Sequence, residues 1–351
     1  MGLGIVIEVN GQTEAELAQA VRVEVTESMG AATAFKLFYH IDIEEGDLPL
    51  LVDSRLDPGS EITVLVPVES GAHCLVKGPV TGQRIHLQHG GAGSTLEVQG
   101  KDNSITMDRE AKSQVWEGLT DSEAVSAISG YYGFVPDVEA TSAGHYSDKH
   151  ALIQRSSDLG FVQQLARRNG CLFWLSCDAY GVQTAHFKRP PLDAPGALEL
   201  IINLASPNIE TLELEWDVEQ PTRVEALQLD LNTLADIDGT VSQSPQPLLA
   251  ANGLASITGD TRSRFLTAPA DDAGDLQARG EGALIESNWF IRARCTTTLE
   301  LLGDLVRAHS VITVRGAGSR HSGSYWVKQS QHIIDSVSHR MNVELLRNAW
   351  E

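Results

Sequence analysis

Two stretches, Ser60-Glu61-Ile62-Thr63-Val64 and Ser310-Val311-Ile312-Thr313-Val314, share the pattern S-x-I-T-V and lie towards opposite ends of the chain. Their isoleucine, threonine and valine residues are β-branched and favour strands. Each stretch precedes two more strand-like segments in the same order: Val76-Lys77 and Ser94–Val98 in the first set, Val327-Lys328 and His339–Leu345 in the second. Self-similarity of this kind indicates a repeated structural unit. We therefore expect two related β-domains, while two unrelated sheets remain the alternative.

Length and composition agree with a multidomain soluble protein. The chain has 351 residues and 42% hydrophobic residues, enough for two or three domains with substantial cores. No apolar run approaches the roughly 18–20 residues that a membrane helix needs. The start, Met1–Glu8, lacks the basic residues and long apolar stretch of a signal peptide. We expect synthesis in the cytosol and no stable membrane insertion.

The charge balance is strongly acidic. The 26 Lys+Arg residues face 47 Asp+Glu residues, a formal net charge of -21. Basic residues cluster only in pairs such as Arg167-Arg168 and Lys188-Arg189, which argues against sequence-specific nucleic-acid binding. The negative charge suits either a conduit wall that does not retain acidic cargo or simple solubility.

The four cysteines follow no metal or redox motif. Cys74, Cys171, Cys177 and Cys295 form no C-x-x-C pair and have no histidine at zinc-finger spacing. Cys171 and Cys177 flank a strand-like segment and lie too far apart along it to bond with each other. We expect buried, reduced thiols.

Two capped helices mark a different kind of domain in the middle of the chain. Thr120 with Glu123 forms a capping-box pattern, and the apolar spacing that follows predicts a helix ending at Tyr131-Tyr132-Gly133. A second helix is predicted from Ser157 or Asp158 to Asn169-Gly170.

The second helix leads directly into a predicted strand, Cys171–Ser176. Helix followed by strand describes a small α+β domain, in which we expect Phe161, Leu165 and Trp174 to form the seam between the two elements.

The remaining segments complete a mainly β architecture of two tube-like β-barrel domains that flank this α+β domain. A proline-rich linker is predicted at 188–196, and the polar stretch from Asn232 to Gly282 is predicted to be a long loop or insertion that either binds a neighbour or has no role. The predicted domains are 1–105, 106–192 and 193–351, the last with the insertion near 232–282. Further strands are predicted at Gly4–Val9, Val21–Glu27, Ala34–Ile43, Leu198–Leu204, Ile209–Val218, Arg223–Leu229 and Phe290–Leu302.

Enzyme motifs are fragmentary. His89–Ser94 is similar to an esterase oxyanion loop, but the sequence contains no G-x-S-x-G elbow, so a hairpin turn is favoured. Gly100-Lys101 lacks the rest of a P-loop.

Other polar groups have simple structural interpretations. His145, Asp148 and His150 are chemically able to bind a metal, although a solvated loop is the favoured interpretation. His332 and His339 are expected to be packing or surface residues, and the acidic pairs Glu44-Glu45 and Asp271-Asp272 solvated charge. No catalytic, cofactor-binding or metal-binding residue and no cofactor is predicted, so the chain is not expected to be an enzyme.

Several motifs, in order, resemble contractile-tail baseplate hub proteins, a family that includes the late control protein D of phages and the N-terminal part of type VI secretion spike proteins. The helix-Gly-strand segment Ser157–Trp174 resembles one unit of that family. The stretch Gly91–Arg109 is similar to its junction between the first barrel and the middle domain. The ending from Gly316 through Ser322–Val327 to His332–Asn348 is similar to its closing strands.

The resemblance implies a structural baseplate hub of a phage or phage-like contractile injection system. Such a hub is a homotrimer whose six similar barrels contact the six-fold tail tube on one side, and a three-fold spike on the other, while lining the channel. The chain ends at Glu351, so the spike is expected to be a separate protein, with other baseplate proteins as further partners. We expect assembly in the bacterial cytoplasm and incorporation into a virion tail or injection-particle baseplate. A tail-associated cell-wall-degrading enzyme and a carbohydrate-binding β-protein are the alternatives.

Overall fold

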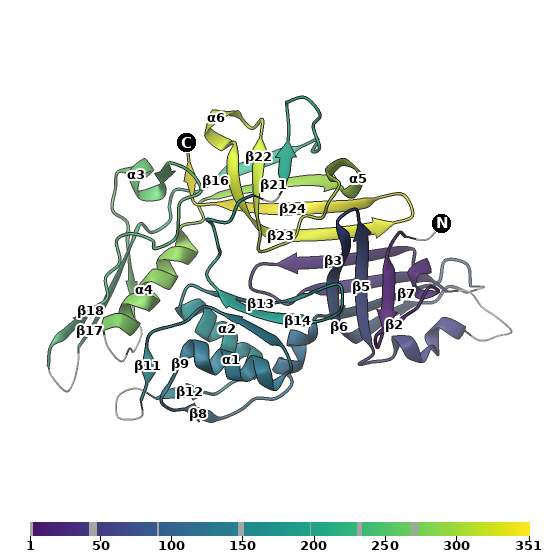
Figure 1. The fold of residues 1–351 in the computed structure, drawn as a ribbon, viewed down its shortest axis with the longest axis horizontal. Helices are drawn as coiled ribbons and strands as arrows, with labels where there is room; N and C mark the ends of the chain where they lie inside the picture. The colour runs from purple at the N-terminus through teal and green to yellow at the C-terminus, as the bar shows by residue number, and fades with distance from the viewer. Residues whose placement is uncertain are drawn as a thin grey trace.

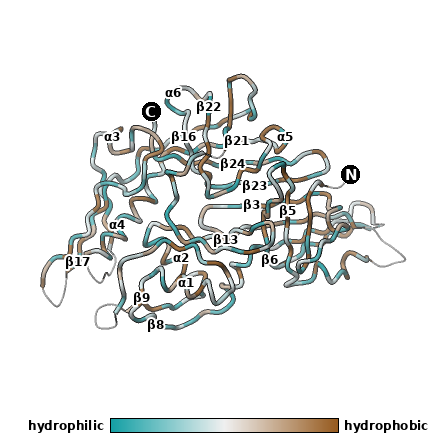
Figure 2. The backbone as a smooth tube through the Cα atoms, in the orientation of Figure 1, coloured by the Kyte–Doolittle hydropathy of each residue, from teal (hydrophilic) through white to brown (hydrophobic). Residues whose placement is uncertain are grey.

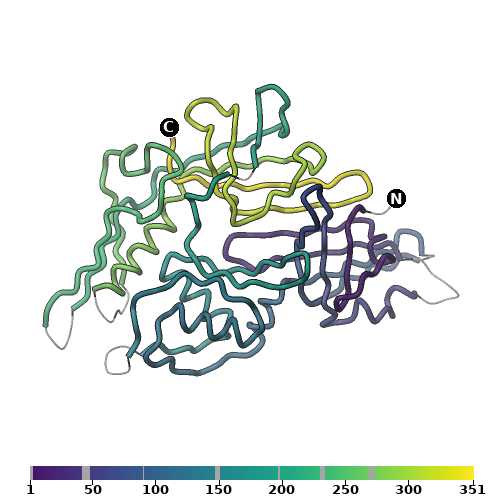
Figure 3. Tube along the Cα trace, viewed as in Figure 1, coloured from purple at the N-terminus to yellow at the C-terminus, as the bar shows by residue number. Residues whose placement is uncertain are grey.

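The computed structural model describes residues 3–41, 48–89, 91–146, 151–196, 198–229, 234–267, 270 and 273–351. Strands dominate, and the molecule divides into four parts that Figure 1 shows from purple to yellow. We name them the first β unit (3–101), the middle unit (102–196), the second β unit (198–216 and 291–351) and the insert (217–290). Figure 3 follows the chain through the first β unit, the middle unit and the insert to the yellow strands at the C-terminus.

The first β unit is built from antiparallel strands with short helical turns between them. Its strands are β1 (Val6–Val9), β2 (Gln12–Thr13), β3 (Arg22–Ser28), β4 (Ala34–His40), β5 (Glu61–Val68), β6 (Gly71–His86) and β7 (Thr95–Lys101), and its turns are η1 (Leu17–Gln19), η2 (Pro49–Leu51) and η3 (Ser54–Leu56). The predicted strands near 4–9, 21–27 and 34–43 correspond to β1, β3 and β4.

The second β unit repeats this construction. It contains β15 (Glu199–Ile201), β16 (Leu212–Trp216), β21 (Ile291–Thr298), β22 (Val311–Arg315), β23 (Gly323–Asp335), β24 (His339–Arg347) and β25 (Ala349–Trp350), with the short helices α5 (Leu299–Leu302) and α6 (Gly318–His321).

Strand pairing follows the same order in both units. The first runs β1-β5-β6-β7-β4-β3 and the second β15-β22-β23-β24-β21-β16. The one change of direction is that β1 is antiparallel to β5, while β15 is parallel to β22. Because β3 also pairs with β23, the units join in one large sheet. In the described residues the pairing follows this path and does not close a separate barrel at each end.

A shared apolar core lies on one face of the sheet. Alternate residues of the strands are buried, and the strand layers in Figure 2 alternate between brown and teal accordingly. The core runs from Ile7, Val23 and Leu37 in the first unit to Leu345 in the second without a break.

The middle unit has its own core between two helices and a small sheet. Its elements are η4 (Asn103–Asp108), β8 (Gln114–Trp116), β9 (Leu119–Thr120), α1 (Asp121–Tyr131), β10 (Val135–Val138), β11 (Gly144–His145), β12 (Leu152–Gln154), α2 (Asp158–Arg168), β13 (Leu172–Cys177) and β14 (Gln183–Lys188). The predicted capping box is confirmed: Thr120 and Glu123 bond reciprocally at the start of α1. Ser157 caps α2 as predicted, its Oγ accepting from the Gly160 amide at 3.2 Å.

Of the three residues predicted to pack between helix and strand in this unit, one does not. Phe161 and Leu165 pack in its core with Phe173, but Trp174 faces the other side of the sheet because successive strand residues alternate. There the Trp174 ring stacks on His309 of the second β unit, with centroids 4.2 Å apart. Trp174 is thus a contact residue between units.

The insert corrects the prediction of a long loop near 232–282. It contains β17 (Arg223–Leu229), β18 (Asp236–Asp238), β19 (Asn252–Gly253), α3 (Leu254–Thr258), β20 (Ser263–Leu266) and α4 (Ala273–Ser287), and β17 lies between β18 and β20. Its glycines serve close packing: a Cβ on Gly239 would lie 2.7 Å from Leu276 of α4, and one on Gly282 would lie 2.7 Å from the Gly170 amide. These glycines, which contributed to the loop prediction, therefore allow α4 to pack closely.

The cysteine prediction is also wrong for one pair. Cys74 of β6 and Cys177 of β13 form a disulfide, with Cα atoms 5.6 Å apart. Cys171 and Cys295 are buried free thiols, as expected. The bonded partners are 103 residues apart, so local spacing could not reveal the pair.

None of the helices among the described residues combines the length and the apolar composition that a membrane span requires.

Candidate assembly interface

A matching pair of backbone hydrogen bonds shows which residues of the two β units correspond to each other. In the first unit Val80 donates to Ser60 O at 2.9 Å and accepts from Gly59 N at 2.9 Å. In the second, Val327 donates to Ser310 O at 2.8 Å and accepts from His309 N at 3.1 Å. A β-bulge follows each valine, before Gly82 in one strand and before Gln329 in the other.

The S-x-I-T-V stretches are therefore equivalent, as the sequence predicted. The second strands match in order but not in the predicted register, because Val327 corresponds to Val80 and not to Val76. The two Val-Lys dipeptides therefore occupy different places in their strands.

Inside the chain the two units meet where β3 pairs with β23. The pairing is antiparallel, with Val23 opposite Ile334 and Val25 opposite His332. All four of these residues are at most 1% exposed. Next to them, the carboxylate of Glu27 bonds Arg307 Nε at 2.7 Å and the Ala308 amide at 3.0 Å. This internal seam buries apolar, polar and charged groups together.

Each of the two strands in this seam has a counterpart at a free edge of the sheet. Strand β16 is the counterpart of β3, since Leu212 lies opposite Cys295 as Val23 lies opposite Leu37. In the described part of the chain, β16 pairs only with β21. The second half of β6 is the counterpart of the second half of β23, and it pairs there only with β7. Both edges present free backbone groups for pairing.

Residues at the free edges suit the pairing that the internal seam shows. By the shared register, Leu214 takes the place of Val25 and Ile85 the place of His332. Leu212 and Leu87 correspond in the same way to Val23 and Ile334. Ile85 and Leu87 are 46% and 55% exposed, although their counterparts are buried.

Polar groups at the two edges are complementary. In the same register, Glu215 on β16, which also bonds Arg292 at 2.9 Å, falls opposite Arg84 on β6, and Glu213 falls opposite His86, a hydrogen-bonding side chain. Arg84 is highly exposed and lies 3.9 Å from its nearest acidic partner, Glu97. Opposite charges facing each other across strands stabilise pairing, and they also select its register.

The candidate metal residues are only partly described. Asp148 and His150 lie outside the described residues. His145 is buried on β11 and its Nε2 lies 2.9 Å from Asp121 Oδ1 at the start of α1. Burial opposes ionisation of Asp121, but hydrogen bonds from His145 and Arg168 outweigh it and lower the pKa of Asp121. His145 therefore anchors a helix start.

The other expected histidines lie in the core of the second unit. His332 on β23 and His339 on β24 are buried, and their rings bond to each other at 3.0 Å. Burial lowers the pKa of His339 to about 4 and holds that of His332 well below its ordinary range. They are packing residues, and His332 belongs to the internal seam.

The His89–Ser94 segment forms the predicted turn between β6 and β7. The Gly91 amide donates to Gln88 O and the Ser94 amide to Gly91 O, while Ser94 Oγ accepts from the Gln88 amide at 2.9 Å. Gly90, Glu44-Glu45 and Asp271-Asp272 lie outside the described residues.

The middle sheet carries a row of hydrogen-bonded side chains that no sequence motif indicated. Ser176 Oγ lies 2.7 Å from His186 Nε2, and His186 Nδ1 lies 2.6 Å from Asp137 Oδ2. Lys188 also bonds Asp137, and the His186 ring stacks on Trp174. The order Ser-His-Asp is that of a hydrolase triad, but here all three residues lie within paired strands and not at a sharp strand-to-helix elbow. The hydrogen-bonded side chains Ser176, His186 and Asp137 hold Trp174 in place beside His309.

Known structures share this fold. The tail protein from Neisseria meningitidis MC58 is 14% identical, with a TM-score of 0.68 over 99% of this chain and 97% of its own. A 43 kDa tail protein of prophage MuSo2 from Shewanella oneidensis is 15% identical, with a TM-score of 0.67 over 99% of each chain.

The c3393 protein of E. coli is described as a type VI secretion component with structural similarity to the T4 bacteriophage tail proteins gp27 and gp5. It is 12% identical, with a TM-score of 0.60 over 97% of this chain and 76% of its own. At such identities the similarity establishes the fold of phage tail and type VI secretion proteins.

Sequence comparison adds the family. No curated protein matches the chain. The family model described as the Alg8 N-terminal domain matches residues 3–336, so the chain belongs to the Alg8 N-terminal domain family.

Proposed function

We propose that this protein is the structural baseplate hub of a contractile tail or related injection particle. Three copies would form a ring that adapts the six-fold tail tube to a three-fold spike. The fold shared with phage tail and type VI secretion proteins supports this class of role. The observation that carries the proposal is the internal β3–β23 seam, whose two counterparts, β16 and the second half of β6, remain free.

Pairing β16 of one copy with β6 of the next repeats the internal seam between copies. Such head-to-tail contacts generate a closed ring when the rotation between units fits. Each chain contributes two equivalent units, so three chains supply six. The six units would then form one closed, tube-like barrel. Internal seams and seams between copies would alternate around it.

The face of the sheet opposite the core suits a channel wall. It is lined by cross-strand ion pairs such as Lys36–Glu97 at 2.7 Å, Arg292–Glu344 at 2.9 Å and Lys328–Glu344 at 3.2 Å. In a closed ring the apolar cores would lie on the outside of the sheet. The opposite face of the sheet would then line the channel. Its mixed charge contrasts with the net charge of -21 and supports passage of cargo without strong retention.

The insert offers a surface for other baseplate proteins. One face of its sheet packs against α4, while the opposite face exposes Leu227, Leu229 and Phe265 at 57%, 48% and 71%. Exposed apolar groups gathered on one face are typical of contact sites. We assign the tube and a separate spike to the two ends of the ring, with assembly in the bacterial cytoplasm and a three-domain division at about 1–105, 106–192 and 193–351.

Cysteine cross-linking tests the ring directly. Leu214→Cys and Ile85→Cys placed in one chain should bond between copies, because the proposed register sets these residues opposite each other. A ladder of cross-linked products that ends at three copies, in the purified chain or in particles, is the expected result.

The matched control pairs Leu214→Cys with Arg84→Cys, which the register places one residue away and on the opposite face of the strand. Equal cross-linking of both pairs, a ladder that ends at six, or no cross-link in assembled particles would each contradict the proposal.

A further inference from the structure

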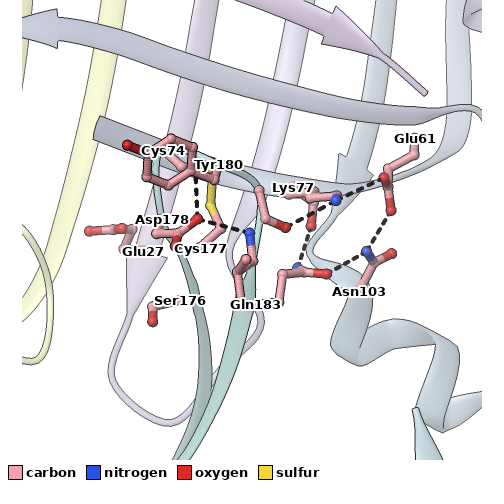
Figure 4. Close-up of a disulfide and its surroundings, with 12 residues drawn as sticks. Glu27, Glu61, Cys74, Lys77, Asn103, Ser176, Cys177, Asp178, Tyr180 and Gln183 are labelled. Atoms are coloured by element: carbon pink, nitrogen blue, oxygen red, sulfur yellow. Dashed lines mark hydrogen bonds and ion pairs between the residues drawn. A yellow bond between two sulfur atoms is a disulfide. The ribbon is translucent and has the colours of Figure 1, made fainter. Parts of the chain in front are cut away.

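The Cys74–Cys177 disulfide joins two parts of the molecule that fold around separate cores. Cys74 lies on the portion of β6 that pairs with β5 in the first β unit, and Cys177 ends β13 of the middle unit. Figure 4 shows the bond between the two strands, with a group of polar side chains beside it. The two cysteines are 103 residues apart in the sequence, and the segment between them holds most of the core of the middle unit.

The non-covalent contacts beside the bond are polar and partly buried. Lys77 Nζ donates to Gly181 O at 3.0 Å, and Gln183 Nε2 donates to Lys77 O at 3.0 Å. Asn103 Nδ2 bridges Gln183 Oε1 at 2.7 Å and Glu61 Oε2 at 2.8 Å. Such bonds exchange readily for bonds to water, so each contributes only modestly to holding the two units together.

We propose that the Cys74–Cys177 bond is a redox-controlled clamp between the first β unit and the middle unit. When it is oxidised, the end of β13 and the turn after it are covalently fixed against β6. When the bond is reduced, only the polar contacts hold the end of β13 and the turn after it against β6. This contact between the two units then opens transiently. Because Lys77, Gly181 and Gln183 all contact across the seam beside the bond, opening would affect them together.

Accessibility of the two sulfur-bearing residues sets the order of exchange. Cys74 is 1% exposed, whereas Cys177 is half-buried at the strand end. With oxidised glutathione, the Cys177 thiolate attacks one glutathione sulfur and releases one glutathione thiolate. The Cys74 thiolate then attacks Cys177 Sγ and releases the second glutathione. Two protein thiols become one disulfide, and their two protons and two electrons pass to glutathione, which leaves as two molecules of the reduced thiol.

The surroundings therefore decide the state of the clamp. A reducing compartment keeps thiols free, while an oxidising one retains disulfides. A chain made under reducing conditions would have a loosened middle unit, and one exposed to oxidising surroundings would have a fixed one. This inference concerns the contact between two units of one chain and does not depend on ring formation.

Hydrogen exchange of the full chain tests the clamp. One preparation is split and equilibrated with oxidised glutathione or with a thiol reductant. Alkylation after denaturation should count two free thiols in the oxidised sample and four in the reduced one. Amides of the β13–β14 pair nearest the bond, around Cys177 and Gln183, should exchange roughly tenfold faster or more in the reduced sample, while those of β23 and β24 stay unchanged.

Variants separate the bond from general effects of reductant. Cys177→Ser should show the fast exchange in both samples, and Cys295→Ser, which alters a free buried thiol in the second β unit, should retain the redox response. Four alkylated thiols after oxidation, or identical exchange at the seam in the two wild-type samples, would overturn the proposal. The wild-type comparison decides the matter even where a variant folds poorly.

Discussion

The two β units follow the same strand order, but they use their edges differently. In the first unit β3 is covered by β23, whereas its counterpart β16 in the second unit has no such neighbour in the described chain. Equivalent residues consequently differ in environment: Val25 is fully buried, and Leu214 is only partly buried. The same strand edge is therefore covered inside the chain in the first unit and is unpaired in the second, which is the asymmetry that the proposed ring would use.

A charge placed at each of the two equivalent positions should give the largest difference between the two units. Val25→Asp should destabilise the folded chain by about 3–5 kcal/mol, because it buries an unpaired carboxylate in the internal seam. Leu214→Asp, at a partly buried position beside the core, should cost clearly less, about 1 kcal/mol, while abolishing assembly. Denaturant unfolding and native mass spectrometry measure the two effects. Equal destabilisation by both variants would mean that β16 is not a free edge.

Acid should loosen the second β unit in a way that has no counterpart in the first. The position of His339 corresponds to Ser94, and that of His332 to Ile85. Folding lowers the pKa of His339 to about 4 from its ordinary value of 6.5. Below pH 6.5 the unfolded chain binds a proton that the folded chain does not, so stability falls as the pH drops from 6.5 towards 4. His339 alone should cost about 3 kcal/mol at pH 4.

Replacing His339 with the residue of the first unit sharpens that test. His339→Ser should flatten the slope of unfolding free energy against pH between 6.5 and 4, whatever it does to stability at neutral pH. Urea unfolding at a series of pH values measures this slope. An unchanged slope would assign the acid sensitivity to other groups.

The insert replaces the short turn between β3 and β4, and its outer face should matter only in assembly. Leu227→Ser together with Phe265→Ser should change the unfolding free energy by no more than about 0.5 kcal/mol per site, since both side chains are exposed. Incorporation into particles should decrease. As a control, Leu276→Ala on the buried face of α4 should cost about 2–5 kcal/mol. Normal incorporation of the double variant would remove the docking role of this face.

One left-handed backbone position is occupied by different residues in the two units. Gly59 has φ +91° and its counterpart His309 has φ +62°. Gly59→Ala has open space for its Cβ, so only the backbone strain of about 1–2 kcal/mol should appear. His309→Gly relieves that strain but loses the stacking on Trp174, so its stability change should be smaller. Thermal unfolding of the two variants compares them, and an equal or larger loss for His309→Gly would show that the stacking outweighs the strain.

Local patterns in the sequence were sufficient for much of the architecture. The S-x-I-T-V repeat and the order of the strands after it could be recognised because strand preference depends on nearby residue types. The caps at Thr120 and Ser157 could be recognised because capping involves residues only three positions apart. The expectation that His332 and His339 lie on strands, as packing or surface groups, followed in the same way, and both lie on strands.

Contacts between residues far apart in the sequence became visible only in the folded chain. The tertiary structure paired Cys74 with Cys177, aligned Val327 with Val80, turned Trp174 towards His309 and brought Ser176, His186 and Asp137 together. It also showed that glycines near 239 and 282 allow α4 to pack closely where composition had indicated a loop. These features depend on contacts between residues far apart in sequence, and local preference carries no information about such contacts until the chain has folded.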